Sequence, residues 1–137
     1  VTKKIIFSFV QLNELISIFP FMDLTHIHNY GISFGLFAGI FPQWFIIFLG
    51  SIIVVFLLFW LFQSSSKFEK YGLILILSGA LSNILDRLIN NYVLDFIFLN
   101  YNNFYWPAFN FADIYISIGI LLIVIESLKL TKTRLKR

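Results

Sequence analysis

A run of nineteen residues, 44–62 (WFIIFLGSIIVVFLLFWLF), contains no charged side chain. At about 1.5 Å per residue in an α-helix, this run covers roughly 28 Å, close to the ~30 Å hydrocarbon core of a bilayer. Hydrophobic residues make up 59% of the 137-residue chain and charged residues only 12%, so a soluble domain of this length could not bury its apolar surface. The sequence therefore predicts an all-α transmembrane bundle.

Two further spans are predicted over residues 71–89 and 108–128. The earlier one reaches membrane length only by running past Asp86, and the later one carries Asp113 in its first two turns. Pro107 stands just before the later span, where the start of a helix tolerates proline. The chain thus contains three predicted spans.

The front of the chain, residues 5–16, is apolar but interrupted by polar side chains, so it is not predicted to cross the membrane. Because the chain begins with Val1 rather than Met, we expect most of a first transmembrane helix to lie upstream, with Lys3 and Lys4 at its outer end. The intact protein would then have four spans, the first largely missing here. All residues, 1–137, are assigned to one membrane-embedded domain.

The short polar loop 63–70 and the tail 129–137 together hold seven of the ten basic residues. Cytoplasmic segments of membrane proteins are enriched in Lys and Arg, so both are placed on the cytoplasmic side. The net charge of +3 therefore reflects membrane topology, and no nucleic-acid binding is expected.

Two external segments, about 5–43 and 90–107, lie on the opposite side in this topology. Both mix β-branched and aromatic residues with turn-forming residues, which is typical of short strands and turns. We expect these strands to form a small external β-cradle. Residues 34–43 (GLFAGIFPQW) are predicted to form a short helix on the membrane surface.

Polar residues mark one side of the span 71–89. Gly79, Asn83 and Arg87 recur at every fourth position and therefore lie along one helical face, with Asp86 beside it. Buried amides and Arg commonly bond between membrane helices, and Asn83, Arg87 and Asn110 are open to that interpretation. For Asp86 the simplest interpretation is an ion pair with Arg87 or a charge at a helix end.

Asp95 and Asp113 are harder to explain as structural residues, because neither has a basic residue within four positions and both lie among large apolar side chains. Asn110 precedes Asp113 by three positions and is predicted to share a helical face with it. Two carboxylates that face each other share one proton. That arrangement suits an aspartic protease, in which one carboxylate takes a proton from water and the other hydrogen-bonds the scissile carbonyl. A proton relay and a structural role remain alternatives.

No metal or cofactor is expected from the residue types present. The chain has no Cys, which excludes disulfides and thiolate metal sites. His26 and His28 are too few for a metal cluster, and we interpret them as interfacial polar residues of a surface strand.

Four short segments occur in order along the chain with the predicted spans between them: 29–35 (NYGISFG), 79–87 (GALSNILDR), 93–97 (VLDFI) and 109–113 (FNFAD). In this combination they resemble the motif segments of the lipoprotein signal peptidase (signal peptidase II) family, membrane aspartic proteases of bacteria. The resemblance covers essentially the whole chain. Ser33 and Ser82 stand where the family usually has Ala and Gly, and both are small residues.

The resemblance implies roles for individual residues. Asp95 and Asp113 would be the catalytic pair, and Gly79 and Asp86 would be structural. The residues expected to bind substrate or support the site are Asn29, Gly31, Asn83, Arg87, Asn110 and Ala112.

The implied activity is an aspartic endopeptidase at the membrane surface that removes signal peptides from diacylglyceryl-modified bacterial prolipoproteins, cutting before the lipidated Cys. Its partners would be the lipobox-containing signal peptide, membrane lipid and the inhibitor globomycin, and the enzyme would be a monomer. The resemblance places it in the bacterial cytoplasmic (inner) membrane, with its site facing the periplasmic or extracellular side. Residues 34–43 would act as a lid.

Two other classes of function compete with this interpretation. In a small proton-coupled carrier or channel subunit, Asp95, Asp113 and Arg87 would relay protons or gate a pathway. The sequence shows no inverted repeat, which argues against a transporter. A non-catalytic membrane scaffold would need apolar spans but no pair of carboxylates.

Overall fold

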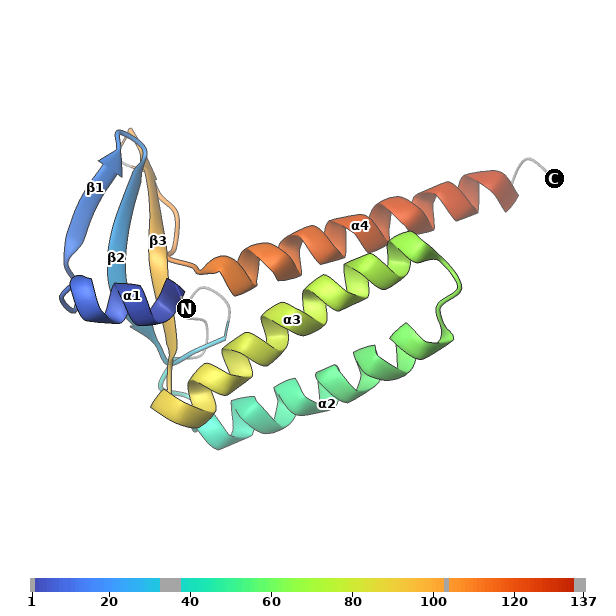
Figure 1. Cartoon of the computed structure of the whole chain (residues 1–137), viewed down its shortest axis with the longest axis horizontal. Helices are drawn as coiled ribbons and strands as arrows, with labels where there is room; N and C mark the ends of the chain where they lie inside the picture. The colour runs from blue at the N-terminus through green and yellow to red at the C-terminus, as the bar shows by residue number, and fades with distance from the viewer. Residues whose placement is uncertain (1, 33–37, 103, 135–137) are drawn as a thin grey trace. The chain divides into compact units, whose positions relative to one another are not determined.

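The computed structural model describes residues 2–32, 38–102 and 104–134, and the side chains of 130–134 are outside the description. The chain forms two compact units. The first comprises Val1–Ile47 and Asp86–Asn110, and the second comprises Phe48–Leu85 and Phe111–Arg137. The first carries a small β-sheet and the second is helical (Figure 1).

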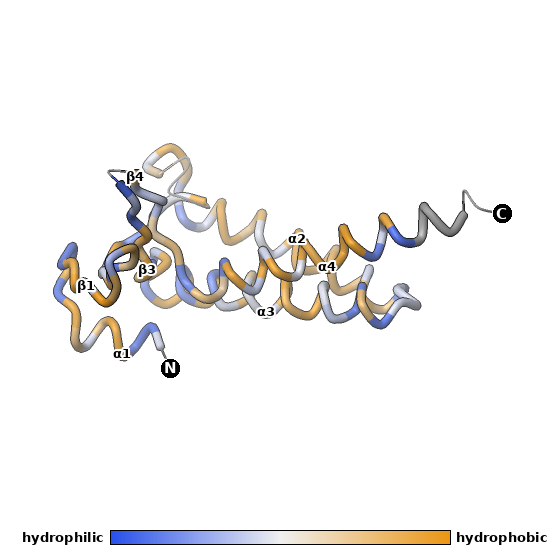
Figure 2. The backbone as a smooth tube through the Cα atoms, turned by 90° about the horizontal axis from the view of Figure 1, so that it is seen from above, coloured by the Kyte–Doolittle hydropathy of each residue, from blue (hydrophilic) through white to orange (hydrophobic). Residues whose placement is uncertain are grey.

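Three helices match the three predicted spans: α2 (Gln43–Gln63), α3 (Lys67–Asn90) and α4 (Phe111–Arg134). Each is long and apolar enough to cross a membrane, α4 over Phe111–Lys129. Most residues of α2 are hydrophobic (orange in Figure 2), and little of the apolar surface of this helix is buried within the chain. The prediction of three helices long and apolar enough to cross a membrane is therefore confirmed, and their surface suits contact with lipid.

Apolar side chains of α2 and α3 form the core of the helical unit. Val54 and Leu57 pack with Leu73 and Leu77, and Leu73 is completely buried. Dispersion contacts of this kind hold membrane helices together, because lipid removes most of the hydrophobic driving force between them.

Carboxylate hydrogen bonds tie the same unit together at the loop between α2 and α3. Trp60 Nε1 donates to Glu69 Oε1 at 3.2 Å, and the Ser64 hydroxyl donates to the other oxygen of Glu69. The Ser66 hydroxyl donates to Glu126 of α4 at 2.5 Å. These donors offset part of the cost of partly burying two carboxylates.

Glycines allow α3 and α4 to approach closely. A Cβ atom on Gly79 would lie 2.4 Å from the carbonyl oxygen of Ala112, and a Cβ on Gly72 would lie 2.7 Å from the carbonyl oxygen of Gly119. Distances this short exclude any side chain, so the two backbones touch directly. Close backbone approach at small residues is a common way to pack transmembrane helices.

The other unit holds four antiparallel strands: β1 (Leu15–Phe19), β2 (Met22–Asn29), β3 (Val93–Tyr101) and β4 (Phe104–Tyr105), in the order β1-β2-β3-β4. The short helix α1 (Thr2–Phe9) packs against β2 and β3 (Figure 1). The predicted strands are therefore confirmed. Their position outside the membrane remains a prediction.

The pairing of β2 with β3 places the first candidate carboxylate. Asp95 lies opposite Ile27, and Val93 lies opposite Asn29. Residues directly opposite each other and those two apart share a face of a sheet, so Asn29 and Asp95 point to the same side. His28, between Ile27 and Asn29, points to the other side.

The predicted surface helix over 34–43 differs from the structure. Residues 34–37 lie outside the described part, Ala38–Ile40 form a turn, and α2 begins only at Gln43. Gly39 has a φ of 78°, in the left-handed region, and Pro42 disfavours a helical conformation at the residue before it. For 38–42 the helix prediction is therefore wrong.

The third span begins later than predicted, at Phe111 rather than residue 108. The backbone of Phe109 pairs with β3: its N–H donates to Ile97 O at 3.0 Å, and its carbonyl accepts from Phe96 N and Ile97 N at 3.0 and 2.9 Å. These bonds hold the segment extended. Asn110 therefore precedes the helix, and the predicted helical face shared by Asn110 and Asp113 does not exist.

Candidate active site

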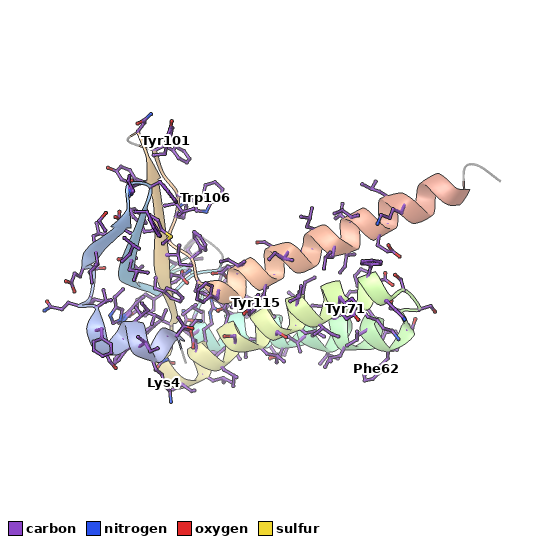
Figure 3. All side chains as sticks on the ribbon, turned by 45° about the horizontal axis from the view of Figure 1, so that its top comes forward. Lys4, Phe62, Tyr71, Tyr101, Trp106 and Tyr115 are labelled. Carbon is purple, nitrogen blue, oxygen red and sulfur yellow. The ribbon has the colours of Figure 1, made fainter. Side chains whose placement is uncertain are left out.

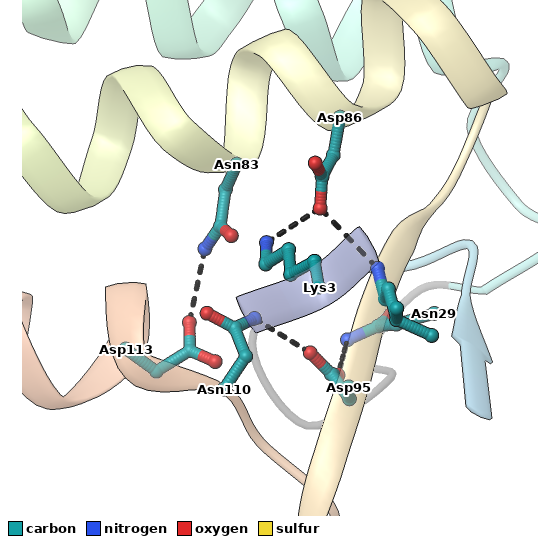
Figure 4. Close-up of polar contacts among 8 residues, drawn as sticks. Lys3, Asn29, Asn83, Asp86, Asp95, Asn110 and Asp113 are labelled. Atoms are coloured by element: carbon teal, nitrogen blue, oxygen red, sulfur yellow. Dashed lines mark hydrogen bonds and ion pairs between the residues drawn. The ribbon is translucent and has the colours of Figure 1, made fainter. Parts of the chain in front are cut away.

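Asp95 is a carboxylate buried in the middle of β3, with 3% of its surface exposed. Asn29 Nδ2 donates to its Oδ2 at 2.8 Å, and Asn110 Nδ2 donates to its Oδ1 at 2.7 Å (Figure 4). Each carboxylate oxygen thus has an amide donor. Such bonds offset part of the cost of burying a carboxylate.

Asn29 is oriented by the turn that follows β2. Its Oδ1 accepts a hydrogen bond from the backbone N–H of Gly31 at 2.9 Å, so its Nδ2 must face Asp95. Arg87, which is buried, donates through Nη2 to the Gly31 carbonyl at 2.6 Å. Arg87 therefore supports Asp95 through two intermediates, Gly31 and Asn29.

Asn110 is oriented from the other side of Asp95. Its side chain is fully buried, at 0% exposure. The hydrogen bonds of the neighbouring Phe109 backbone to β3 fix its position along the strand. Asn29, Gly31, Arg87, Asp95 and Asn110 are hereafter the Asp95 cluster.

Asp113 lies in the first turn of α4, where the helix dipole favours a negative charge. Asn83 Nδ2, from α3, donates to its Oδ1 at 3.0 Å (Figure 4). The direct contact of Gly79 with the Ala112 carbonyl lies one helical turn before Asn83 and one residue before Asp113. That contact sets the helix spacing at which the bond forms. Gly79, Asn83, Ala112 and Asp113 are hereafter the Asp113 cluster.

Asp86 was interpreted as a partner of Arg87 or a helix-end charge, and the structure assigns it an ion pair with Lys3 (Figure 4). Asp86 lies near the end of α3, and Lys3 lies in α1, 83 positions away along the chain. The Leu94 backbone N–H also points to Asp86, at 3.4 Å. Lys3 is the residue near the site that sequence reasoning missed, because nothing in its local spacing connects it to Asp86.

His26 and His28 form a network on the opposite face of β2 from Asn29. His26 Nδ1 donates to the Val10 carbonyl at 2.8 Å, and the Nε2 atoms of the two rings are 3.1 Å apart. His28 stacks on Tyr92 with ring centroids 3.6 Å apart. His26 is buried, so the prediction that both are interfacial polar residues is wrong for His26.

The surroundings of His28 and Tyr92 shift the pKa values of both residues. Burial, and then the neighbouring His26, lower the pKa of His28. Burial, and then Tyr30 and Asp86, raise the pKa of Tyr92. Within the described residues, no group of three or more His, Cys, Asp or Glu side chains could hold a metal ion.

The structure thus sorts the predicted residues into two clusters, each described within its own unit. In both, a carboxylate receives hydrogen bonds from Asn amides, which are neutral. A carboxylate held in this way can act as a base when ionised and as an acid when protonated. Ser33, Phe34 and Gly35 of the predicted segment 29–35 lie outside the described residues.

Comparison with protein families gives one match that covers most of the chain. A family model described as signal peptidase (SPase) II matches residues 1–129. The lipoprotein signal peptidase of Thermodesulfovibrio yellowstonii is 40% identical over 129 residues, which cover 94% of this chain and 86% of the relative. That of Alteromonas mediterranea is 39% identical over 132 residues, covering 93% and 72%.

Solved structures give a similar result. One described as a bacterial membrane enzyme has a TM-score of 0.88 and 30% sequence identity, covering 96% of this chain and 81% of the other. A second with the same description has a TM-score of 0.82 and 30% identity, covering 93% and 83%. The fold is therefore that of a known membrane enzyme.

Proposed function

The chain belongs to the signal peptidase II family, and we propose that it removes the signal peptides of prolipoproteins with Asp95 and Asp113 as its catalytic carboxylates. Removal of signal peptides follows from the family. The aspartic chemistry and the roles of individual residues are the new part of the proposal.

One observation carries the assignment of these two residues: each receives a hydrogen bond from an Asn side chain that its own unit brings to it. Asn110 holds Asp95, and Asn83 holds Asp113. A neutral amide stabilises the position of a carboxylate without fixing it in the ionised state. A Lys or Arg side chain, in contrast, would hold the carboxylate ionised. Catalytic carboxylates that exchange a proton need this freedom.

Chain geometry supports a joint action of the two carboxylates. Asn110, which binds Asp95, is followed three positions later by Asp113. Three residues span at most about 11 Å even when fully extended. Asp113 is therefore tethered close to the residue that holds Asp95, whatever the relative placement of the two units.

In the proposed reaction, the ionised carboxylate takes a proton from a water molecule, whose oxygen attacks the scissile carbonyl carbon. The protonated carboxylate donates its proton to the carbonyl oxygen, which gives a neutral tetrahedral diol. One diol hydroxyl then returns its proton to a carboxylate as the carbonyl re-forms, the C–N bond breaks, and a proton from the pair passes to the leaving nitrogen. The products are a signal peptide with a free carboxyl group and a lipoprotein with a free amine.

The membrane setting supports the proposed substrate. Three apolar helices keep the enzyme in the bilayer, where a hydrophobic signal peptide and a diacylglyceryl-modified Cys are also found. We propose cleavage just before that Cys by a monomeric enzyme of the cytoplasmic membrane with four spans when intact. Its sheet and site would lie on the outer side, and globomycin would inhibit it.

The test is to replace each carboxylate with an isosteric amide. Asp95→Asn and Asp113→Asn should each reduce cleavage of a lipidated prolipoprotein in detergent by at least ~10²-fold, because an amide can neither take nor give the proton. Asp23→Asn is the matched control, since Asp23 accepts a hydrogen bond from Asn100 in the sheet and belongs to neither cluster. Full cleavage by either cluster variant, with the control also active, would overturn the assignment.

A further inference from the structure

Lys3, Asp86 and the start of β3 form a connected group within one unit. The ammonium of Lys3 pairs with Asp86 Oδ2, and the same oxygen receives the Leu94 N–H at 3.4 Å (Figure 4). The side chains of Lys3 and Asp86 are only 20% and 18% exposed, so solvent screens this pair less than it would a surface pair. Three elements, α1, α3 and β3, thus meet at one carboxylate.

Leu94 directly precedes Asp95 on β3. The residues Val93, Leu94 and Asp95 are all buried, so a displacement of the Leu94 backbone is transmitted to the Asp95 carboxylate rather than absorbed by solvent. The bonds of Asn29 and Asn110 to Asp95 are sensitive to such a displacement, because hydrogen bonds weaken steeply with poor geometry. The position of Asp86 therefore bears on the position of Asp95.

Asp86 also carries a charge next to this strand. Its field reaches the beginning of β3, since it contributes, after burial and Tyr30, to the raised pKa of Tyr92. An unbalanced carboxylate at the Leu94 backbone, one residue before Asp95, would disfavour the ionised form of Asp95. The ammonium of Lys3 balances that charge.

Among the described residues, other charged or titratable groups of the elements around Asp95 have contacts or orientations of their own. Arg87 donates to the Gly31 carbonyl, and Lys4 is exposed and points outward (Figure 3). His28 points to the other face of the sheet, as the alternation of side chains along β2 requires. Asp113 is the proposed partner of Asp95. Lys3 is the cation that pairs with Asp86, so its removal would change the balance of charge there.

We propose that Lys3 is a positioning residue for catalysis: through Asp86 it holds the backbone at Leu94 and balances the charge beside Asp95. The proposal rests on the proposed function, because it takes Asp95 to be a catalytic carboxylate. It adds to that function a residue outside both clusters.

The experiment measures kcat and KM for a lipidated prolipoprotein over a range of pH in detergent. Lys3→Gln should lower kcat about tenfold with little change in KM, and move the acid limb of the kcat profile to higher pH. Asp86→Asn should move that limb to lower pH, and the double variant should return it towards its original position. Lys3→Arg, which retains the positive charge, should keep the acid limb at its original position.

Lys4→Gln is the matched control, because it removes an exposed lysine from the same helix and should leave the profile unchanged. Thermal unfolding of each variant separates a loss of folding from an effect on catalysis. The positioning role is overturned if Lys3→Gln folds and keeps both its kcat and the acid limb of its kcat profile unchanged. It is also overturned if adding Asp86→Asn to Lys3→Gln does not reverse the shift of the acid limb.

Asp95→Asn is measured alongside these variants. If it is inactive while Lys3→Gln keeps the original profile, only the positioning role fails. If Asp95→Asn is active, the proposed function itself fails.

If Lys3→Gln does not fold, the test uses the Lys3→Arg variant and the Lys3→Gln/Asp86→Asn double variant. An unchanged kcat profile in the double variant supports charge balance. A shifted profile overturns it.

Discussion

The three asparagines that bind the proposed catalytic carboxylates share one property, which is that their amides carry no charge. Asn29 and Asn110 each donate to a different oxygen of Asp95, and Asn83 donates to Asp113. Of the cations near the site, Lys3 pairs with Asp86, and Arg87 donates to the Gly31 carbonyl. Neutral donors of this kind hold a carboxylate in place and leave it able to exchange a proton.

His28 is expected to make the folding stability of the protein depend on pH. Burial and His26 lower its pKa below the usual value of 6.5, so as pH falls through 6.5 the unfolded chain gains a proton that the folded chain does not. The unfolded state then binds more protons, and folding stability decreases towards acidic pH. Thermal unfolding in detergent should show this loss of Tm between pH 7 and pH 5.

His28→Phe removes the titrating group and retains a ring that can stack on Tyr92. We expect its Tm to fall less than that of the unsubstituted protein over the same pH interval. The comparison is made between the two pH dependences, because the variant also loses the bond to His26 at all pH values. Identical pH dependences would show that His28 contributes nothing to acid sensitivity.

Among the elements, the packing of α3 on α4 determines whether Asn83 can reach Asp113. The backbones meet at Gly79 and Ala112, so the donor and the acceptor lie on helices with no side chain between them at that point. The helix dipole of α4 then acts on Asp113 in its first turn. The geometry of the Asp113 cluster is thus a property of two packed helices rather than of a loop.

Gly79→Ala tests this dependence. The added Cβ would lie 2.4 Å from the Ala112 carbonyl oxygen and 2.7 Å from an Ile116 side-chain atom, so the helices must move apart. Overpacking of this kind costs about 1–3 kcal/mol, of which roughly 1 kcal/mol is offset by the better helix propensity of Ala. We expect a lower Tm and a lower kcat, measured in detergent.

Gly50→Ala is the matched control for Gly79→Ala. Its Cβ would meet only side-chain atoms of Ile84, at 3.3 and 3.4 Å, which can adjust. The control should keep both Tm and kcat. Equal effects of the two substitutions would show that the close contact at Gly79 has no special role.

At the scale of the whole molecule, hydropathy was enough to predict three helices long and apolar enough to cross a membrane, because lipid imposes the same requirement on every spanning segment. The order of turn-forming and β-branched residues also indicated the strands. Contacts distant in sequence were not accessible: Lys3 and Asp86 are 83 positions apart, and the pairing of Phe109 with β3 displaced Asn110 from the expected helix. The local periodicity of hydrophobic residues carries no information about the Lys3–Asp86 pair or about the pairing of Phe109 with β3.

Membrane topology is the last prediction, and the absence of Cys from the sequence makes it simple to test. Ser17 lies in β1, before α2, and Ser65 lies in the loop after α2, and both are exposed. Since one transmembrane helix separates them, they must lie on opposite sides of the membrane, and the basic residues that follow Ser65 favour the cytoplasm.

In intact cells, a membrane-impermeant maleimide should therefore label Ser17→Cys and not Ser65→Cys, and permeabilisation should allow labelling of both. Labelling in denaturant controls for the reactivity of each thiol. The reverse pattern would place the sheet in the cytoplasm, where Asp95 could not meet a substrate delivered on the outer side. Labelling of both without permeabilisation would mean that α2 does not cross the membrane.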